Sequence, residues 1–132
     1  MKMEPIVKTF YDALEQGKMM GRRCKRCGAV EFPPVICCNS CSSTDLEWIE
    51  ISGNAEMTDM ILVNVLSAKP ENQDLMPYCL ACVKLKEGPA FNAIVCNISQ
   101  ENKTILEDKL PVPIKARIAQ RDGYKTVVFD LA

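Results

Sequence analysis

The segments CKRC at residues 24–27 and CNSC at residues 38–41 decide how the first third of this chain folds. Each is a Cys-x-x-Cys turn whose two sulfurs can converge on one point, and ten residues separate the two turns. Two such turns close the tetrahedron in which four thiolates bind Zn²⁺. We therefore predict one structural zinc ion, with no open position for water or substrate, held by Cys24, Cys27, Cys38 and Cys41.

Three alternatives to this zinc site use the same segment. The four cysteines could pack in a core, but paired Cys-x-x-Cys turns in a polar segment favour metal. Iron in a rubredoxin-like site would make the chain an electron-transfer protein, which would be coloured. Cys37 could replace Cys38, but it breaks the two-residue spacing, so we place it outside the ligand set.

Composition excludes several classes of function. The 132 residues carry a net charge of −1, which gives no excess of positive charge for a polyanionic partner. No apolar run is long enough to cross a bilayer or to act as a secretory signal, so we expect a cytoplasmic protein with reduced thiols and no membrane partner. The sequence contains no histidine, which removes Ser-His-Asp and Cys-His catalysis, and we predict no catalytic residues.

Outward from the cysteines, the apolar pattern is helical on one side and β on the other. Upstream, apolar residues recur at helical spacing and predict a helix over 4–20, with Gly17 as a stop signal. Downstream, we predict loops at 69–77 and 100–113, a helical turn at 105–109, and five or six strands at 48–51, 57–66, 78–86, 90–98, 114–120 and 125–131. This strand pattern is close to that of a small closed barrel such as an OB-fold.

The remaining cysteines invite a redox interpretation that the β pattern opposes. CLAC at residues 79–82 matches a redox motif, but residues i and i+3 of a strand point to opposite faces. We therefore predict that Cys79, Cys82 and Cys96 are small buried hydrophobic residues. No base is evident that could activate one of them as a nucleophile.

A basic cluster surrounds the first Cys-x-x-Cys turn and consists of Arg22, Arg23, Lys25 and Arg26. It is either a solvated surface or an anion site for the phosphates of a cofactor or a nucleic acid. A barrel that binds single strands needs a platform of aromatic residues and a basic groove. Aromatic residues make up only 6% of the chain, so we do not expect nucleic acid as a partner.

These motifs, in this order, resemble the zinc-ribbon/OB-fold proteins associated with acyl-CoA enzymes, which often occur beside thiolases. The resemblance runs along essentially the whole chain and is carried by CKRCG at 24–28, FPP at 32–34, CNSC at 38–41 and PY at 77–78. It implies a mainly β protein with an N-terminal helix (1–23), a rubredoxin-like zinc ribbon (24–44) and a five-stranded OB-fold barrel (45–132). Asn39 departs from the family pattern, which often has proline there.

The resemblance also implies a partner subunit without catalytic residues of its own. We expect a non-catalytic subunit of a thiolase-type acyl-CoA C-acyltransferase complex, which supports acyl-CoA binding and the active conformation of the thiolase subunit. Aromatic acyl-CoA thiolases such as benzoylsuccinyl-CoA thiolase are one family context. A MaoC-type enoyl-CoA hydratase as partner and a nucleic-acid-binding module are the alternatives. The basic cluster would contact the CoA phosphates or the partner.

Overall fold

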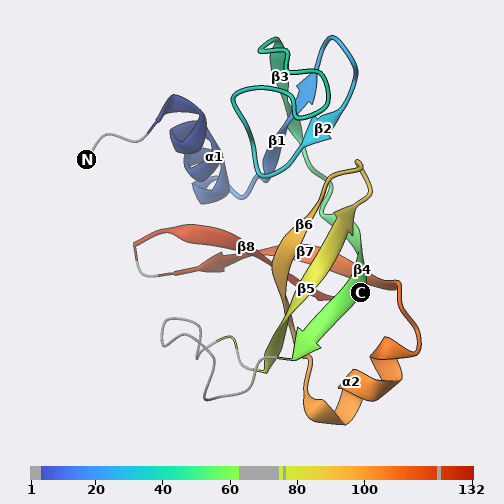
Figure 1. Cartoon of the computed structure of the whole chain (residues 1–132). Helices are drawn as coiled ribbons and strands as arrows, with labels where there is room; N and C mark the ends of the chain where they lie inside the picture. Colours follow the sequence, from blue (N-terminus) through green and yellow to red (C-terminus); the bar gives the residue numbers. More distant parts are fainter. Residues whose placement is uncertain (1–3, 63–74, 76, 122) are drawn as a thin grey trace. The chain divides into compact units, whose positions relative to one another are not determined.

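The computed structural model describes residues 4–62, 75, 77–121 and 123–132. They form two compact units, and Figure 1 shows their elements. The first unit contains residues 1–53, 86–89 and 118–127, and the second contains 54–85, 90–117 and 128–132. Neither of the two helices in the described part of the chain is long and apolar enough to cross a membrane.

The first unit begins with helix α1, Pro5–Glu15. The Glu4 carboxylate accepts hydrogen bonds from the backbone amides of Ile6 and Val7 at 3.0 and 3.1 Å, which caps the otherwise unpaired first turn. The helix ends well before residue 20, the limit expected from the sequence. Gly17, predicted as the stop signal, has a φ of 81° and reverses the chain direction after the helix. A strand then begins at Met20.

A three-stranded antiparallel sheet follows the helix, and Cys24 is the last residue of its central strand. Its strands are β1 (Met20–Cys24), β2 (Val30–Glu31) and β3 (Leu46–Glu50), in the order β2-β1-β3. Gly21 packs closely on its neighbours, because a Cβ there would approach the Glu31 carbonyl oxygen and the Ile51 side chain to 2.9 Å. The sequence pattern did not predict β1 and β2, because MGRRC in β1 shows no alternation of apolar and polar residues and β2 has only two residues.

Five strands form a closed barrel in the order β4-β5-β6-β8-β7. Helix α2 comes between the third and fourth strands along the chain, and this connectivity is that of an OB-fold. The elements are β4 (Asn54–Leu62), β5 (Tyr78–Leu85), β6 (Ala90–Cys96), α2 (Gln100–Glu107), β7 (Val112–Gln120) and β8 (Lys125–Leu131). The predicted fold class, a mainly β protein with an N-terminal helix, a zinc ribbon and a five-stranded barrel, is therefore confirmed.

Alternate residues of the barrel strands point inward and build an apolar core. In β5 the residues from Cys79 to Leu85 alternate between buried and exposed, as expected for a half-buried strand. The Phe91 and Phe129 rings meet in this core with centroids 6.2 Å apart. Its fully buried members include Met57, Val83, Leu85, Val95, Ile114, Val128 and Phe129.

Helix α2 is longer than the helical turn expected at 105–109. It begins at Gln100 because the Asn102 side chain accepts from the Ser99 backbone amide at 2.8 Å and donates to the Asn97 carbonyl at 2.9 Å. This is a capping arrangement in which asparagine takes the place of the usual glutamate or glutamine. The strand predicted at 48–51 belongs to the ribbon sheet as β3, so the strand predicted at 57–66 is the first of the barrel. The end of that strand at 63–66 and most of the predicted loop at 69–77 lie outside the described residues.

Candidate functional site

The structure brings four thiols together at the end of the ribbon sheet. The sulfurs of Cys24, Cys27, Cys38 and Cys41 all lie within 4.8 Å of one another. The sulfurs of Cys24 and Cys41 are 3.5 Å apart, and those of Cys27 and Cys38 are also 3.5 Å apart. A zinc–sulfur distance of about 2.3 Å gives a tetrahedron with edges of about 3.8 Å, so the donor set and its spacing fit Zn²⁺.

The two Cys-x-x-Cys turns, here called knuckles, have the same backbone hydrogen bonds. In the first, the Cys24 amide donates to the Ala29 carbonyl at 2.8 Å and the Cys24 carbonyl accepts from Gly28 at 2.9 Å. In the second, Cys38 makes the same two bonds with Ser43 and Ser42, both at 2.9 Å. Gly28 and Ser42 both have positive φ, 81° and 64°. The sequence marked the first turn with glycine but gave no such signal for Ser42.

Backbone amides point at the first sulfur of each knuckle. The Cys27 amide hydrogen-bonds to Cys24 and lowers the pKa of the Cys24 thiol to about 6. The Cys41 amide does the same for Cys38 and lowers the pKa of that thiol below its usual value. Because zinc binds thiolates, these amides prepare the two sulfurs for the metal.

Burial separates the ligand set from its neighbour Cys37. Cys24 and Cys38 are each 1% exposed and pack with Leu46, whereas Cys37 is exposed. Cys37 is not among the clustered thiols. The spacing argument that placed Cys37 outside the site therefore agrees with the geometry.

Three of the four members of the basic cluster already have partners in the structure. Arg22 donates to the carbonyls of Val35 and Leu46. Arg23 forms an exposed ion pair with Glu47, and Lys25 lies 3.8 Å from the Asp45 carboxylate. Within the described part of the chain, the Arg26 guanidinium has no such partner. Of the four candidates, Arg26 is therefore the one whose guanidinium has neither a hydrogen-bond partner nor an ion-pair partner among the described residues.

The cysteines of the barrel divide between its two faces. Cys79 points inward, and burial raises the pKa of its thiol to about 11. Cys96 is also buried, with the Arg117 guanidinium 3.5 Å from its sulfur. Cys82, predicted to be buried, is exposed and lies 3.5 Å from Asn92 Oδ1. That prediction was wrong for Cys82 because the strand alternation that separates it from Cys79 also turns it to solvent.

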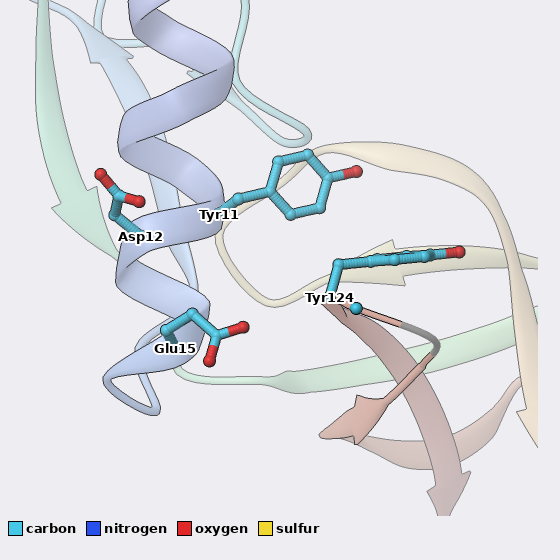
Figure 2. Close-up of a pocket in the computed structure, with 5 residues that line it drawn as sticks. Tyr11, Asp12, Glu15 and Tyr124 are labelled. Carbon is cyan, nitrogen blue, oxygen red and sulfur yellow. The ribbon is translucent and has the colours of Figure 1, made fainter. Parts of the chain in front are cut away.

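A pocket of about 510 Å³ lies in the first unit between helix α1 and the hairpin that joins β7 to β8. Figure 2 shows that the Tyr11 side chain leaves helix α1 on the side where Tyr124 lies, while Asp12 points to the other side. The two carboxylates that line the pocket are already in ion pairs. Asp12 lies 2.6 Å from the Lys8 ammonium, and Glu15 lies 3.7 Å from that of Lys125. The pocket is lined by Tyr11, Asp12, Glu15, Gly123 and Tyr124.

Aromatic rings link this pocket to the zinc ribbon through edge-to-face contacts. The Tyr124 and Tyr11 centroids are 6.3 Å apart, those of Tyr11 and Phe10 are 5.3 Å apart, and those of Phe10 and Phe32 are 5.8 Å apart. Phe32 is buried in the arm between the two knuckles. Helix α1 is therefore packed on the ribbon through its aromatic face, while Val7 and Tyr124 remain 42% and 46% exposed.

The outer face of β5 and β6 lacks the aromatic platform of a barrel that binds single strands. A smaller cavity of about 200 Å³ opens there, lined by Asp59, Met60, Leu80, Ala81, Cys82 and Asn92. The half-buried Phe91 ring packs at a tilt against the buried Phe129 ring, and Tyr78 is buried. No aromatic residue of the described chain is therefore exposed on β5 or β6 for base stacking.

Fold and site together define a zinc-ribbon protein with an OB-fold barrel. Residues 12–47, which include all four clustered cysteines, match the model of the ChsH2 rubredoxin-like zinc ribbon domain. A DUF35 domain-containing scaffold protein of Methanocaldococcus jannaschii is 30% identical over 98 residues, which are 74% of this chain and 68% of the relative. The chain belongs to the DUF35 family, and its metal is structural zinc.

Other relatives extend the likeness to the whole chain. A DUF35 domain-containing scaffold protein of Methanothermobacter thermautotrophicus is 27% identical over 92% of this chain and 90% of its own length. A solved structure named Ltp2-ChsH2(DUF35) aldolase superposes with a TM-score of 0.76 at 22% identity, covering 99% of this chain and 98% of that one. This structural likeness independently supports the fold.

One relative is an enzyme subunit much longer than this chain. A probable enoyl-CoA hydratase alpha subunit of Thermomonospora curvata is 30% identical over 79 residues. These residues are 60% of this chain but only 24% of the relative. The similar region is therefore one part of that longer subunit.

Proposed function

We propose that this chain is a non-catalytic subunit of a thiolase-type acyl-CoA C-acyltransferase complex, which supports acyl-CoA binding and the active conformation of the catalytic subunit. The observation that carries the proposal is family membership: the relatives that match most of their length are scaffold proteins. The chain has no histidine, and its described metal-binding cluster uses four thiolates that leave no coordination position for substrate. The reacting groups therefore belong to a partner.

The names of the relatives favour a partner that acts on acyl-CoA. The aldolase named Ltp2-ChsH2(DUF35) supports an enzyme that makes or breaks a carbon–carbon bond, which is also what thiolases do. The probable enoyl-CoA hydratase alpha subunit supports the second candidate, a MaoC-type hydratase. In either case, this chain would work in the cytoplasm, where its eight cysteines stay reduced.

The test is to purify the tagged chain from the cells in which it is native and to identify what co-elutes in stoichiometric amount. We expect a thiolase-fold enzyme whose acyl-CoA activity rises when the zinc-loaded chain is added back. A hydratase in the eluate would favour the second candidate. Elution of the chain alone, or acyl-CoA turnover by the isolated chain, would contradict both.

Helix α1 and the pocket beside it offer the surface for this partner. Val7 and Tyr124 expose large apolar side chains in the first unit. We expect Val7→Asp and Tyr124→Asp to lower the affinity for the co-purified enzyme by about 10-fold or more, because each would place a charge in an apolar interface. The matched control is Ile105→Asp on α2, which changes a 57% exposed apolar residue elsewhere on the chain.

Arg26 is the candidate contact for the CoA phosphates. Its guanidinium has no partner in the described part of the chain, whereas Arg23 and Lys25 are in ion pairs. We expect Arg26→Ala to raise the KM of the complex for acyl-CoA with less effect on kcat. Arg23→Ala is the control, because its charge is already neutralised by Glu47.

A further inference from the structure

Two side chains that are not metal ligands reach from the ribbon sheet to the second knuckle. Arg22 on β1 and Glu31 on β2 are opposite each other in the register of the sheet. Each makes two hydrogen bonds to the backbone or side chains around Cys38 and Cys41. The pair therefore connects the strands next to the first knuckle with the segment that carries the second.

Arg22 holds both ends of that segment with one guanidinium. Its Nη1 donates to the Val35 carbonyl at 3.0 Å, and its Nη2 donates to the Leu46 carbonyl at 3.0 Å. Val35 precedes Cys38, and Leu46 follows Cys41 while its own side chain packs on the buried sulfurs of Cys24 and Cys38. The flat guanidinium fits this double contact, and a lysine ammonium would not.

Trp48 fixes the plane of the Arg22 head group. The Arg22 Cζ lies 5.2 Å from the centroid of the Trp48 ring, within range of a cation–π contact. The Nε of Arg22 is buried and has no hydrogen-bond acceptor among the described residues. The two Nη groups therefore carry all of the polar contacts of this side chain. Nη1 is directed at the arm that leads into the second knuckle, and Nη2 at the first residue of β3, where the chain returns to the sheet after that knuckle.

Glu31 holds the tip of the second knuckle. One oxygen of its carboxylate accepts from the Asn39 backbone amide at 3.2 Å, and the other accepts from Asn39 Nδ2 at 3.1 Å. Asn39 lies between the two ligands Cys38 and Cys41. A charged acceptor on a backbone amide of the turn opposes rotation of the knuckle away from the metal.

We propose that Arg22 and Glu31 are positioning residues for the zinc site. They hold the second knuckle at the distance from the first at which four sulfurs form one tetrahedron. Outer-shell partners of metal ligands typically change metal affinity by about 10- to 100-fold. Loss of either side chain therefore lets the second knuckle open more often, and zinc leaves faster although all four thiolates remain.

The test compares zinc release from the full-length, zinc-loaded protein to excess chelator. We expect Arg22→Lys and Glu31→Gln each to speed release by about 10-fold. Glutamine presents an NH₂ group to one of the two Asn39 donors, so Glu31→Gln loses a contact without a change in size. The visible spectrum of the Co²⁺-substituted protein should also change, because it reports the arrangement of the four sulfurs.

Arg23 and Glu47 supply the matched controls, because they too are a cross-strand pair, on β1 and β3, and form an exposed ion pair. Arg23→Lys and Glu47→Gln should leave the zinc release rate and the Co²⁺ spectrum unchanged. Release from the Arg22 and Glu31 variants within twofold of the wild type would overturn the proposal. Equal acceleration by the controls would also overturn it. If Arg22→Lys fails to fold, Glu31→Gln decides, since its contacts are on the surface.

Discussion

The zinc ribbon and the barrel are ordered by different means. In the ribbon, the buried cluster around the metal site consists of Cys24, Cys38 and Leu46, with Ala29 and Cys41 packed against it. In the barrel, inward-pointing aliphatic and aromatic side chains fill the interior, from Met57 on β4 to Phe129 on β8. The ribbon therefore depends on metal–thiolate bonds where the barrel depends on apolar burial.

The ribbon and the barrel should therefore unfold under different treatments. A short sheet with so few buried side chains cannot offset the entropy of ordering its loops, so it needs the metal. A closed barrel has no free edge strands and buries its own core, so it does not. Removal of zinc should therefore disorder the ribbon alone, and a cavity in the apolar core should destabilise the barrel alone.

Replacement of one zinc ligand should have the largest effect and should be confined to the ribbon. Structural zinc contributes about 10–16 kcal/mol of binding free energy, and Cys38→Ser removes one of four thiolates. We expect loss of zinc by metal analysis and loss of dispersed amide NMR signals from residues 20–50, while the signals of the barrel persist. Cys37→Ser is the control and should keep zinc. Loss of the barrel signals as well would show that the barrel depends on the metal.

A cavity in the barrel should have the converse effect. Phe129 is 1% exposed and packs on Phe91, so Phe129→Ala should lower the free energy of unfolding of the barrel by about 3–5 kcal/mol. Zinc content should stay unchanged in native conditions. Leu80→Ala, at a 48% exposed position on β5, should change this free energy by less than about 0.5 kcal/mol. Zinc loss from Phe129→Ala would show that the zinc site depends on the core of the barrel.

Much of this fold could be predicted because its two signals are local. The spacing of CKRC and CNSC defines a tetrahedral site without knowledge of the rest of the chain. Alternation in β5, and the turns that flank it, likewise predict a half-buried strand. The strands of the barrel that lie in the described residues begin and end within a few positions of their predicted limits.

What could not be predicted depends on contacts between distant residues. Strands β1 and β2 are set by pairing with each other and with β3, and their few residues carry no period of their own. The charge of Arg22 suggested an anion site in the sequence. In the structure its guanidinium instead donates to the carbonyls of Val35 and Leu46, which are 13 and 24 positions away along the chain. Sequence position alone does not show which charges are already paired.

A substitution at a tight backbone contact in the ribbon should have an effect of intermediate size on stability. A methyl group at Gly21 would lie 2.9 Å from the Glu31 carbonyl oxygen, which is backbone and cannot move without shifting β2. We expect Gly21→Ala to cost about 1–3 kcal/mol, measured as a lower midpoint of ribbon melting in the zinc-loaded protein. Arg23→Ala, at an exposed position of the same strand, serves as the control. An unchanged midpoint would show that zinc alone fixes β2.

The smallest effects should come from the cysteines of the barrel, which separate packing from ligation within one residue type. Cys79 is fully buried, so Cys79→Ala should cost about 1 kcal/mol of barrel stability, and Cys82→Ala, on the exposed face, less than about 0.5 kcal/mol. Neither should change zinc content, in contrast to Cys38→Ser.

Alkylation of the native protein should distinguish the buried face of the barrel, which carries Cys79, from the exposed face, which carries Cys82. With a pKa of about 11, only about one Cys79 thiol in a thousand is a thiolate at pH 8, and burial also blocks the reagent. Iodoacetamide at pH 8 should therefore label Cys82, and with it the exposed Cys37, long before Cys79, as mass spectrometry of peptides would show. Labelling of Cys79 at the rate of Cys82 would mean that the barrel opens readily. Its apolar core would then not be the stable counterpart of the metal-held ribbon.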